Sequence, residues 1–351
     1  MATLTQASIG SRRIIRYTLF GIIGFTIFRS LFWMGVGIYR HYFPAPPPPP
    51  KVEFGKLPAL PFLDKPFPEN ITFSLETADG TFPKFDYQAN VYYMPAVNTG
   101  LLSLDTARDK AVSLGFSNAG EQITDTIYRF PNAKSLASIQ MSIATGVFSI
   151  SYNLAADPTP LSTRPPTGDA ATTKVKSLLS GADLLATDLS EGEVKTEYVK
   201  LVNDKIVGAS SLSDANFTKV NLYRKKYNDL PPINPDTSSA NVWFIVSGEG
   251  QKEKSVIAGE YHYFPIDETK SSTYPIKTAQ DAWNELTAGK AKLISLGNKP
   301  EATSYVIRKV YLAYYDSGTT MDFYQPVVVF EGDNGFVAVT PAVTSNYYQS
   351  E

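Results

Sequence analysis

The chain has 351 residues, of which 43% are hydrophobic, and its 32 basic side chains nearly balance 34 acidic ones. A net charge of −2 gives no electrostatic reason to expect nucleic-acid binding. Because the chain has no cysteine, disulfides, thiolate catalysis, a lipid-anchored N-terminal cysteine and cysteine-based zinc sites are excluded.

The N-terminal part of the chain differs from the rest in charge and hydropathy. Residues 1–50 contain five arginines and no acidic residue. The stretch from Tyr17 to Tyr39 is mostly apolar, and its 23 residues exceed the about 20 that span a bilayer as a helix. Basic residues flank this stretch, namely Arg12, Arg13, Arg16, Arg40 and Lys51. The positive-inside bias then predicts a cytoplasmic N-terminus and an extracytoplasmic body.

We therefore expect residues 1–43 to form a cytoplasmic tail and a single-pass transmembrane anchor in the cell membrane. A cleaved signal peptide is the main alternative, but the apolar stretch is long for one and no convincing small-residue cleavage site follows it.

Arg29 lies near the middle of the apolar stretch. A charge at the bilayer centre is costly and usually has a partner. Two interpretations stay open: the side chain snorkels toward the headgroups, or it pairs with an acidic or polar group on another membrane helix. Arg29 is thus the one candidate site residue, as a contact with a membrane partner.

A proline-rich stalk is predicted for residues 44–69. It opens with seven residues, "PAPPPPP", from Pro44 to Pro50. Such a sequence favours an extended left-handed helix that rises about 3.1 Å per residue, so it makes a stiff spacer of roughly 20 Å.

The body is predicted to contain repeated units of one helix and one three-stranded antiparallel meander. Two helices are expected to open with Thr-Ala-x-Asp, at Thr106 and Thr278, which resembles a capping box with an acid in the first turn. The second continues with the apolar spacing of a core face, at Ala279, Ala282, Trp283 and Leu286. The predicted class is α+β, with an N-terminal transmembrane helix followed by a first unit (70–155), a middle unit (169–272) and a C-terminal unit (273–351).

Four carboxylates lie in the strand-rich stretch from Tyr311 to Val339, namely Asp316, Asp322, Glu331 and Asp333. Alternation predicts that Val310, Leu312 and Tyr314 face one side of a strand and Tyr311, Ala313 and Tyr315 the other. Asn334-Gly335 is a strong hairpin signal, since both residues accept positive φ.

We favour a structural role for these acids and expect the three aspartates at exposed loops. The alternative is a glycosidase-like pair that faces across a cleft. His262 is one possible base, although a strand histidine among tyrosines is more often structural. With neither a serine elbow nor a phosphate-binding loop in the sequence, we predict a protein that is not an enzyme, with no catalytic residue, cofactor or metal.

The C-terminal segments "IKTAQDAWNELTAGKAKLISL", "YVIRKVYLAYYD" and "QPVVVFEGDNGFVAV" resemble the C-terminal unit of the YycH/YycI family, over residues 275–343. The helix-plus-sheet units are also similar to PepSY-like domains. The resemblance implies a membrane-anchored regulator that contacts a sensor kinase through its membrane helix and its exported domains. The polyproline stalk and the long middle region depart from that family.

The expected function is therefore that of a membrane-anchored extracytoplasmic binding and regulatory protein. Its expected partners are the lipid bilayer and another membrane or envelope protein, and no nucleic acid. Two alternatives stay open: a cell-envelope enzyme that uses carboxylates on glycan or peptide, and a structural surface protein.

Overall fold

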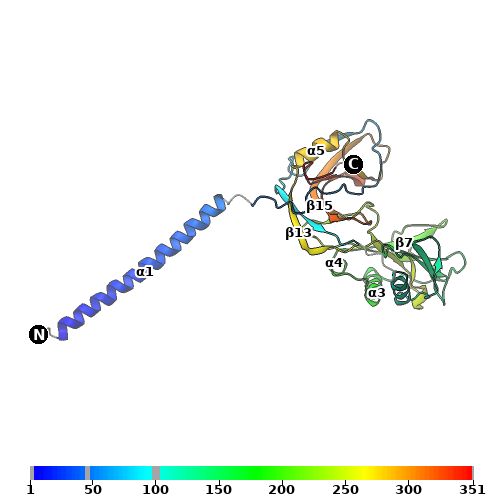
Figure 1. Cartoon of the computed structure of the whole chain (residues 1–351), viewed down its shortest axis with the longest axis horizontal. Coiled ribbons are helices and arrows are strands. Elements are labelled where there is room, and N and C mark those ends of the chain that lie inside the picture. Colours follow the sequence, from blue (N-terminus) through cyan, green and yellow to red (C-terminus); the bar gives the residue numbers. More distant parts are fainter. Residues whose placement is uncertain (1–3, 44–47, 97–102, 350–351) are drawn as a thin grey trace. The chain divides into compact units, whose positions relative to one another are not determined.

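The computed structural model describes residues 4–43, 48–96 and 103–349. The chain forms two units, Met1–Pro49 and Pro50–Glu351 (Figure 1). The predicted α+β class is confirmed, since an apolar N-terminal helix is followed by a body built largely from antiparallel sheets. Part of the predicted stalk, residues 44–47, lies outside the described residues.

The first unit contains one long helix, α1 (Leu4–Tyr42), of 39 residues. Apolar side chains from Tyr17 to Tyr42 are exposed around it. Its hydrophobicity is thus not concentrated on one face, as it is in a helix that packs on a soluble core.

The largest sheet of the body has nine strands, all paired antiparallel, in the order β3-β4-β5-β6-β12-β11-β9-β7-β8. Their bounds are β3 Glu121–Gln122, β4 Ile127–Pro131, β5 Ala137–Ser142, β6 Phe148–Tyr152, β7 Val194–Val202, β8 Lys205–Gly208, β9 Phe217–Leu222, β11 Val242–Val246 and β12 Val256–Tyr261. Strands β4, β5 and β6 form the first predicted meander. Pairing of β6 with β12 joins strands of the predicted first and middle units in one sheet.

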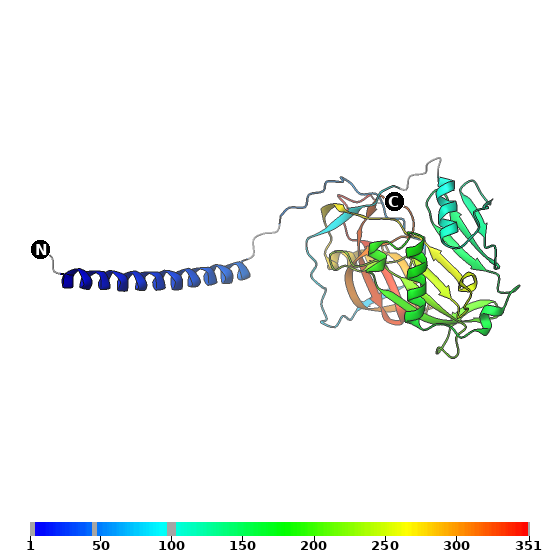
Figure 2. The same cartoon turned by 90° about the horizontal axis from the view of Figure 1, so that it is seen from below.

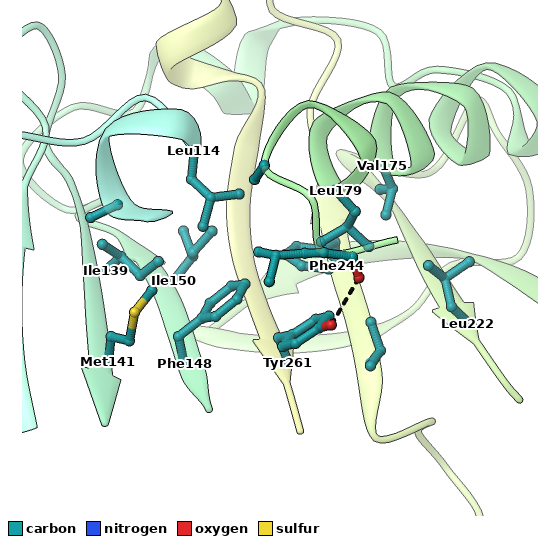
Figure 3. Packing of buried hydrophobic residues seen from close by; sticks show 14 of the residues in the cluster. Leu114, Ile139, Met141, Phe148, Ile150, Val175, Leu179, Leu222, Phe244 and Tyr261 are labelled. Carbon is teal, nitrogen blue, oxygen red and sulfur yellow. Dashed lines mark hydrogen bonds between the residues drawn. The ribbon is translucent and has the colours of Figure 1, made fainter. Parts of the chain in front are cut away.

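Two helices, α2 (Ser103–Ser113) and α3 (Gly168–Gly181), pack on the same hydrophobic core as this sheet, and Figure 2 shows α3 in green along its face. In Figure 3, Leu114 just after α2 and Leu179 of α3 point toward Phe148, Phe244 and Tyr261 of the strands. Helix α2 begins three residues before the predicted start at Thr106. Three further short helical turns are η1 Thr159–Ser162, α4 Thr187–Ser190 and η2 Lys252–Lys254.

A second sheet contains most of the C-terminal strands, in the order β1-β15-β17-β18-β14, with β10 also paired to β15. Its elements are β1 Thr72–Leu75, β10 Pro232–Ile233, β14 Lys292–Leu296, β15 Ser304–Tyr315, β17 Pro326–Gly332, η3 Asp333–Gly335 and β18 Phe336–Pro341. Strands β15, β17 and β18 form the predicted C-terminal meander. A small third sheet consists of β13 Asp267–Pro275, β2 Gln88–Tyr93 and β16 Phe323–Tyr324.

Helix α5 (Ala279–Thr287) matches its sequence signals. The Thr278 hydroxyl accepts a hydrogen bond from the Asp281 backbone N–H at 3.1 Å, which caps the helix as predicted. Ala279, Ala282 and Leu286 are buried against the C-terminal sheet, so the predicted core face is confirmed.

The alternation predicted for β15 is also confirmed. Val310 and Leu312 pack in the core cluster that contains α5, whereas Ala313 and Tyr315 pack in a different cluster on the other face. The turn between β17 and β18 has the predicted positive φ, +60° at Asn334 and +84° at Gly335. The division of the body into residues 70–155, 169–272 and 273–351 stays a prediction.

Candidate functional site

Helix α1 is the first candidate site. Within the described ranges it is the one helix whose length and hydropathy suit a bilayer crossing, over Arg16–Arg40, which contains an 18-residue stretch with a mean hydropathy of 1.7. Tyr17 and Tyr39 lie near the two ends of this segment, where amphipathic rings favour the membrane interfaces. Arg29 is exposed near the middle of the segment, where a helix of a partner protein could reach it. The contact of Arg29 with a membrane partner stays a prediction.

A buried ionic cluster in the body was not foreseen. The Arg224 guanidinium donates from Nη1 to Asp188 Oδ2 at 2.6 Å and from Nε to Asp316 Oδ2 at 3.0 Å. Its Nη2 donates to the Phe264 carbonyl oxygen. The Arg224 side chain is only 1% exposed. One cation thus lies between two carboxylates, away from solvent.

Aromatic side chains complete this cluster. The guanidinium carbon of Arg224 lies 4.3 Å from the ring centroid of Tyr263, a cation–π distance. The hydroxyls of Tyr263 and Tyr227 donate to the two oxygens of Asp188, at 2.9 and 3.3 Å. Although burial lowers the pKa of Arg224, Asp316 and Asp188 raise it by more, so the pKa lies above its usual value. For Tyr227 and Tyr263, burial raises the pKa, so both hydroxyls stay neutral and donate hydrogen bonds.

The ionic cluster connects elements that are far apart in the sequence. Arg224 follows β9 of the nine-stranded sheet, Asp188 lies in α4, and Asp316 directly follows β15 of the C-terminal sheet. The buried cation and its two carboxylates link the two sheets, and separation of the sheets would leave buried charges without their partners, which is costly.

The expectation that Asp316 is an exposed turn residue is therefore wrong. Its side chain is buried, because it is a partner of Arg224. The sequence signal was weak: Arg224 lies in the basic run "YRKKY", where nothing distinguishes the buried cation from the lysines that follow it.

The other acids of that stretch lie nearer the surface. Asp322 is exposed, as expected, and Asp333 is partly exposed and accepts two hydrogen bonds from Arg308, at 2.9 and 2.8 Å. Glu331 accepts from the Tyr311 hydroxyl at 2.5 Å. His262 lies at the surface, with Nδ1 3.3 Å from the Gly318 carbonyl oxygen. None of these contacts forms a facing pair of carboxylates.

A groove of about 720 Å³ lies between the nine-stranded sheet and the C-terminal sheet. Its lining includes Tyr223, Pro232, Ile233, Tyr311, Glu331 and Val337. Burial raises the pKa of Tyr223 to about 12, and burial followed by Glu331 raises that of Tyr311, so both phenols are neutral hydrogen-bonding groups at physiological pH. Half of the lining residues carry charged or polar side chains, and the rest are apolar or aromatic residues and glycines, so the groove suits a ligand with both apolar and charged groups.

Lysines and acids at the rim of the groove are already paired in part. Lys225 Nζ lies 3.4 Å from Glu191 and 3.0 Å from Glu268, and Lys195 Nζ lies 3.8 Å from Glu193. The Lys195–Glu193 pair is exposed and of small energetic value, whereas Lys225 is only 25% exposed between its two exposed acidic partners.

The chain matches no known protein family, and no curated protein matches it. Among solved structures, it is similar to an uncharacterized protein from Eubacterium rectale, with a TM-score of 0.41 and 11% identity, over 81% of this chain and 92% of that one. The Bacillus megaterium YpeB C-terminal domain matches with a TM-score of 0.32 and 12% identity, over 69% and 93%. Both similarities are too distant to support an argument about function, and the resemblance to the YycH/YycI family stays a hypothesis from the sequence.

Proposed function

We propose that this chain is a single-pass, membrane-anchored extracytoplasmic protein that binds and regulates another membrane or envelope protein. The observation that carries the proposal is the apolar segment Arg16–Arg40, whose side chains are exposed over a length that fits a bilayer. Exposed apolar surface of this extent needs either lipid or another helix around it.

Charge supports the orientation of this proposal. Arg12 and Arg13 before the apolar segment, and Arg16 at its start, favour a cytoplasmic N-terminus, and the body after the segment is net acidic. The resemblance over residues 275–343 suggests a sensor kinase as the partner.

The position of Arg29 supports a contact inside the membrane. A guanidinium near the bilayer centre costs at least about 2.5–3.5 kcal/mol on insertion scales. An acidic or polar group on a partner helix offsets this cost through a paired hydrogen bond.

Cysteine labelling tests the orientation cleanly, because the natural chain has no cysteine. In spheroplasts, a membrane-impermeant maleimide should label Lys51→Cys and should label Ala2→Cys only after lysis. The reverse pattern would contradict the proposed orientation. Loss of an N-terminal tag from the mature protein would instead indicate a cleaved signal peptide.

A further inference from the structure

Strand β15 has two short neighbours on one edge. β1 pairs in parallel with Ser304–Ile307, and β10 pairs in parallel with Tyr314–Tyr315. The other edge of β15 pairs with β17. Between the two neighbours, and within the described part of the chain, no strand pairs on this side with the six residues from Arg308 to Ala313. We call these six residues the open edge.

Backbone groups of the open edge are available for pairing. The Tyr314 N–H donates to the Pro231 carbonyl oxygen and the Asp316 N–H to that of Ile233, so both point to the edge that carries β10. Because directions alternate along a strand, Val310 and Leu312 direct their N–H and C=O groups to the same edge. Within the described residues, no backbone hydrogen bond reaches these groups there.

The open edge adjoins the groove described above. Tyr311 lies in the middle of the open edge, and it lines the groove. Pro232 and Ile233 of β10 line the groove as well. An extended segment added to this edge therefore brings alternate side chains toward the groove while its backbone pairs with β15.

The protein's own strands show which occupant suits this edge. β1 and β10 are both extended and both run parallel to β15, so the same edge already takes such segments twice. The Glu76 N–H already donates to the Ile307 carbonyl oxygen, and the Pro231 carbonyl oxygen accepts from the Tyr314 N–H. The four residues from Lys309 to Leu312, at about 3.3 Å each, therefore leave room for roughly 13 Å of extended chain.

The charged residues that line the groove indicate which side chains a bound segment should carry. The Arg224 charge is neutralised by its two buried aspartates. The remaining charged groups of the groove are three lysines and four carboxylates, namely Lys195, Lys225, Lys226, Glu191, Glu193, Asp236 and Glu331. This excess of negative charge complements a basic side chain.

We infer that the open edge and the groove together bind an extended peptide segment of a partner protein. The segment runs parallel to β15 between β1 and β10, and it directs apolar and basic side chains to the groove. This inference rests on the proposed function, since it describes how the body holds the regulated protein.

Hydrogen exchange resolved to single amides tests the premise on the full chain in mild detergent. Val310 and Leu312 should exchange at least about tenfold faster than Tyr311 and Ala313, whose amides face β17. Equal protection of all four amides would overturn the inference, because the edge would then be covered.

The binding test uses a displayed library of random octapeptides selected on the same full chain. Selected peptides should alternate apolar and basic residues with other residues, and they should slow exchange at Val310 and Leu312. Failure to select any peptide, or protection elsewhere only, would overturn the inference.

Two variants block the open edge. Leu312→Pro removes an N–H that no strand of the fold uses, and should weaken binding of the selected peptide at least about tenfold. Leu312→Val is the control and should bind within about threefold of the natural chain. If Leu312→Pro fails to fold, Lys309→Cys carrying a bulky maleimide replaces it, because the Lys309 side chain is 73% exposed.

Lys205→Cys on the exposed edge strand β8, with the same label, is the matched control and should bind normally. Equal binding by the blocked and control forms would overturn the inference. A photoreactive maleimide on Lys309→Cys that crosslinks in membranes only to a second copy of this chain would also overturn it. Because these tests do not depend on orientation in the membrane, their failure leaves the labelling test of the proposed function unaffected.

Discussion

Arg224 Nε donates to Asp316 Oδ2 across 3.0 Å, although the two residues are 92 positions apart in the sequence. The pair connects the end of β9 to the end of β15, and both side chains are almost fully buried. Groove walls on either side of this pair come from the same two sheets. The ion pair therefore fixes the geometry of the groove as well as the contact between the sheets.

Arg224→Met should lower the free energy of unfolding of the body by about 3–5 kcal/mol. The substitution leaves Asp188 and Asp316 buried without their cation, which is the costly way to break a buried pair. Urea unfolding of the full chain in mild detergent, followed by tryptophan fluorescence, measures the change. Lys225→Met is the neighbouring control, and a loss as large as that of Arg224→Met would contradict the assignment.

Asp316→Asn and Asp322→Asn should differ clearly in the same urea assay. Asp316 accepts a charge-assisted hydrogen bond in a buried site, so its replacement should cost about 1.5–3 kcal/mol. Asp322 is exposed, and its replacement should change the free energy of unfolding by no more than about 0.5 kcal/mol. Equal effects of the two substitutions on the free energy of unfolding would contradict the burial of Asp316.

Asp157 should contribute stability that depends on pH. Hydrogen bonds from Lys254, Thr159 and Tyr152 lower its pKa below the ordinary value of 3.8. A carboxyl whose pKa is lowered by folding stabilises the protein above its unfolded pKa, and this contribution is lost as the pH falls through the folded pKa. Asp157→Asn should thus lower the melting temperature at pH 7, and the difference from the natural chain should shrink below about pH 3.8.

Thermal melts between pH 2 and pH 7 check this dependence. Asp79→Asn, at an exposed turn, is the control and should show no such trend. A constant difference between Asp157→Asn and the natural chain across the whole range would contradict the role of the carboxylate charge.

Gly192 should tolerate no side chain. A Cβ at this position would lie 1.8 Å from the Tyr223 carbonyl oxygen, and backbone must move to make room. Gly192→Ala should lower the free energy of unfolding by about 1–3 kcal/mol. It should also weaken the binding of ligands in the groove, because Gly192 lines it. Gly181→Ala, at the end of α3 with no atom within 4 Å, should instead stabilise the protein by up to about 1 kcal/mol. Equal stability of the two variants would contradict the close packing at Gly192.

Arg29→Leu should leave expression and orientation intact but weaken association with a membrane partner. The expected cause is the loss of a paired hydrogen bond within the bilayer. Arg29→Lys should restore association only in part, since lysine lacks the planar fork for two parallel hydrogen bonds. Co-purification in mild detergent compares the three chains, and equal recovery of the partner would mean that Arg29 only snorkels.

Local features of the fold could be predicted from the sequence. The Thr278 cap, the core face of α5 and the alternation along β15 each depend on residues within one element, and all are confirmed. The Asn334-Gly335 turn is of the same kind, because positive φ is a property of those residues themselves.

Long-range features were missed for a physical reason. Strand β14 is short and follows a helix closely, so its sequence carries little alternation of its own, and its pairing with β18 depends on residues far along the chain. The partnership of Arg224 with Asp188 and Asp316 is equally non-local. No pattern in one segment records which distant segment supplies the opposite charge.

The position of β1 has a consequence for the order of folding. Thr72–Leu75 pairs with Ser304–Ile307, and Leu57 pairs with Tyr348 in an isolated bridge. Leu57 and β1 therefore cannot pair in this way during synthesis until about 230 to 290 further residues have been added. Contacts of such high sequence separation form slowly. Because synthesis begins at the N-terminus, the early segment must stay extended without aggregating until the C-terminal segment has been made. Prolines in the early segment favour an extended backbone and remove N–H donors that could pair with other chains.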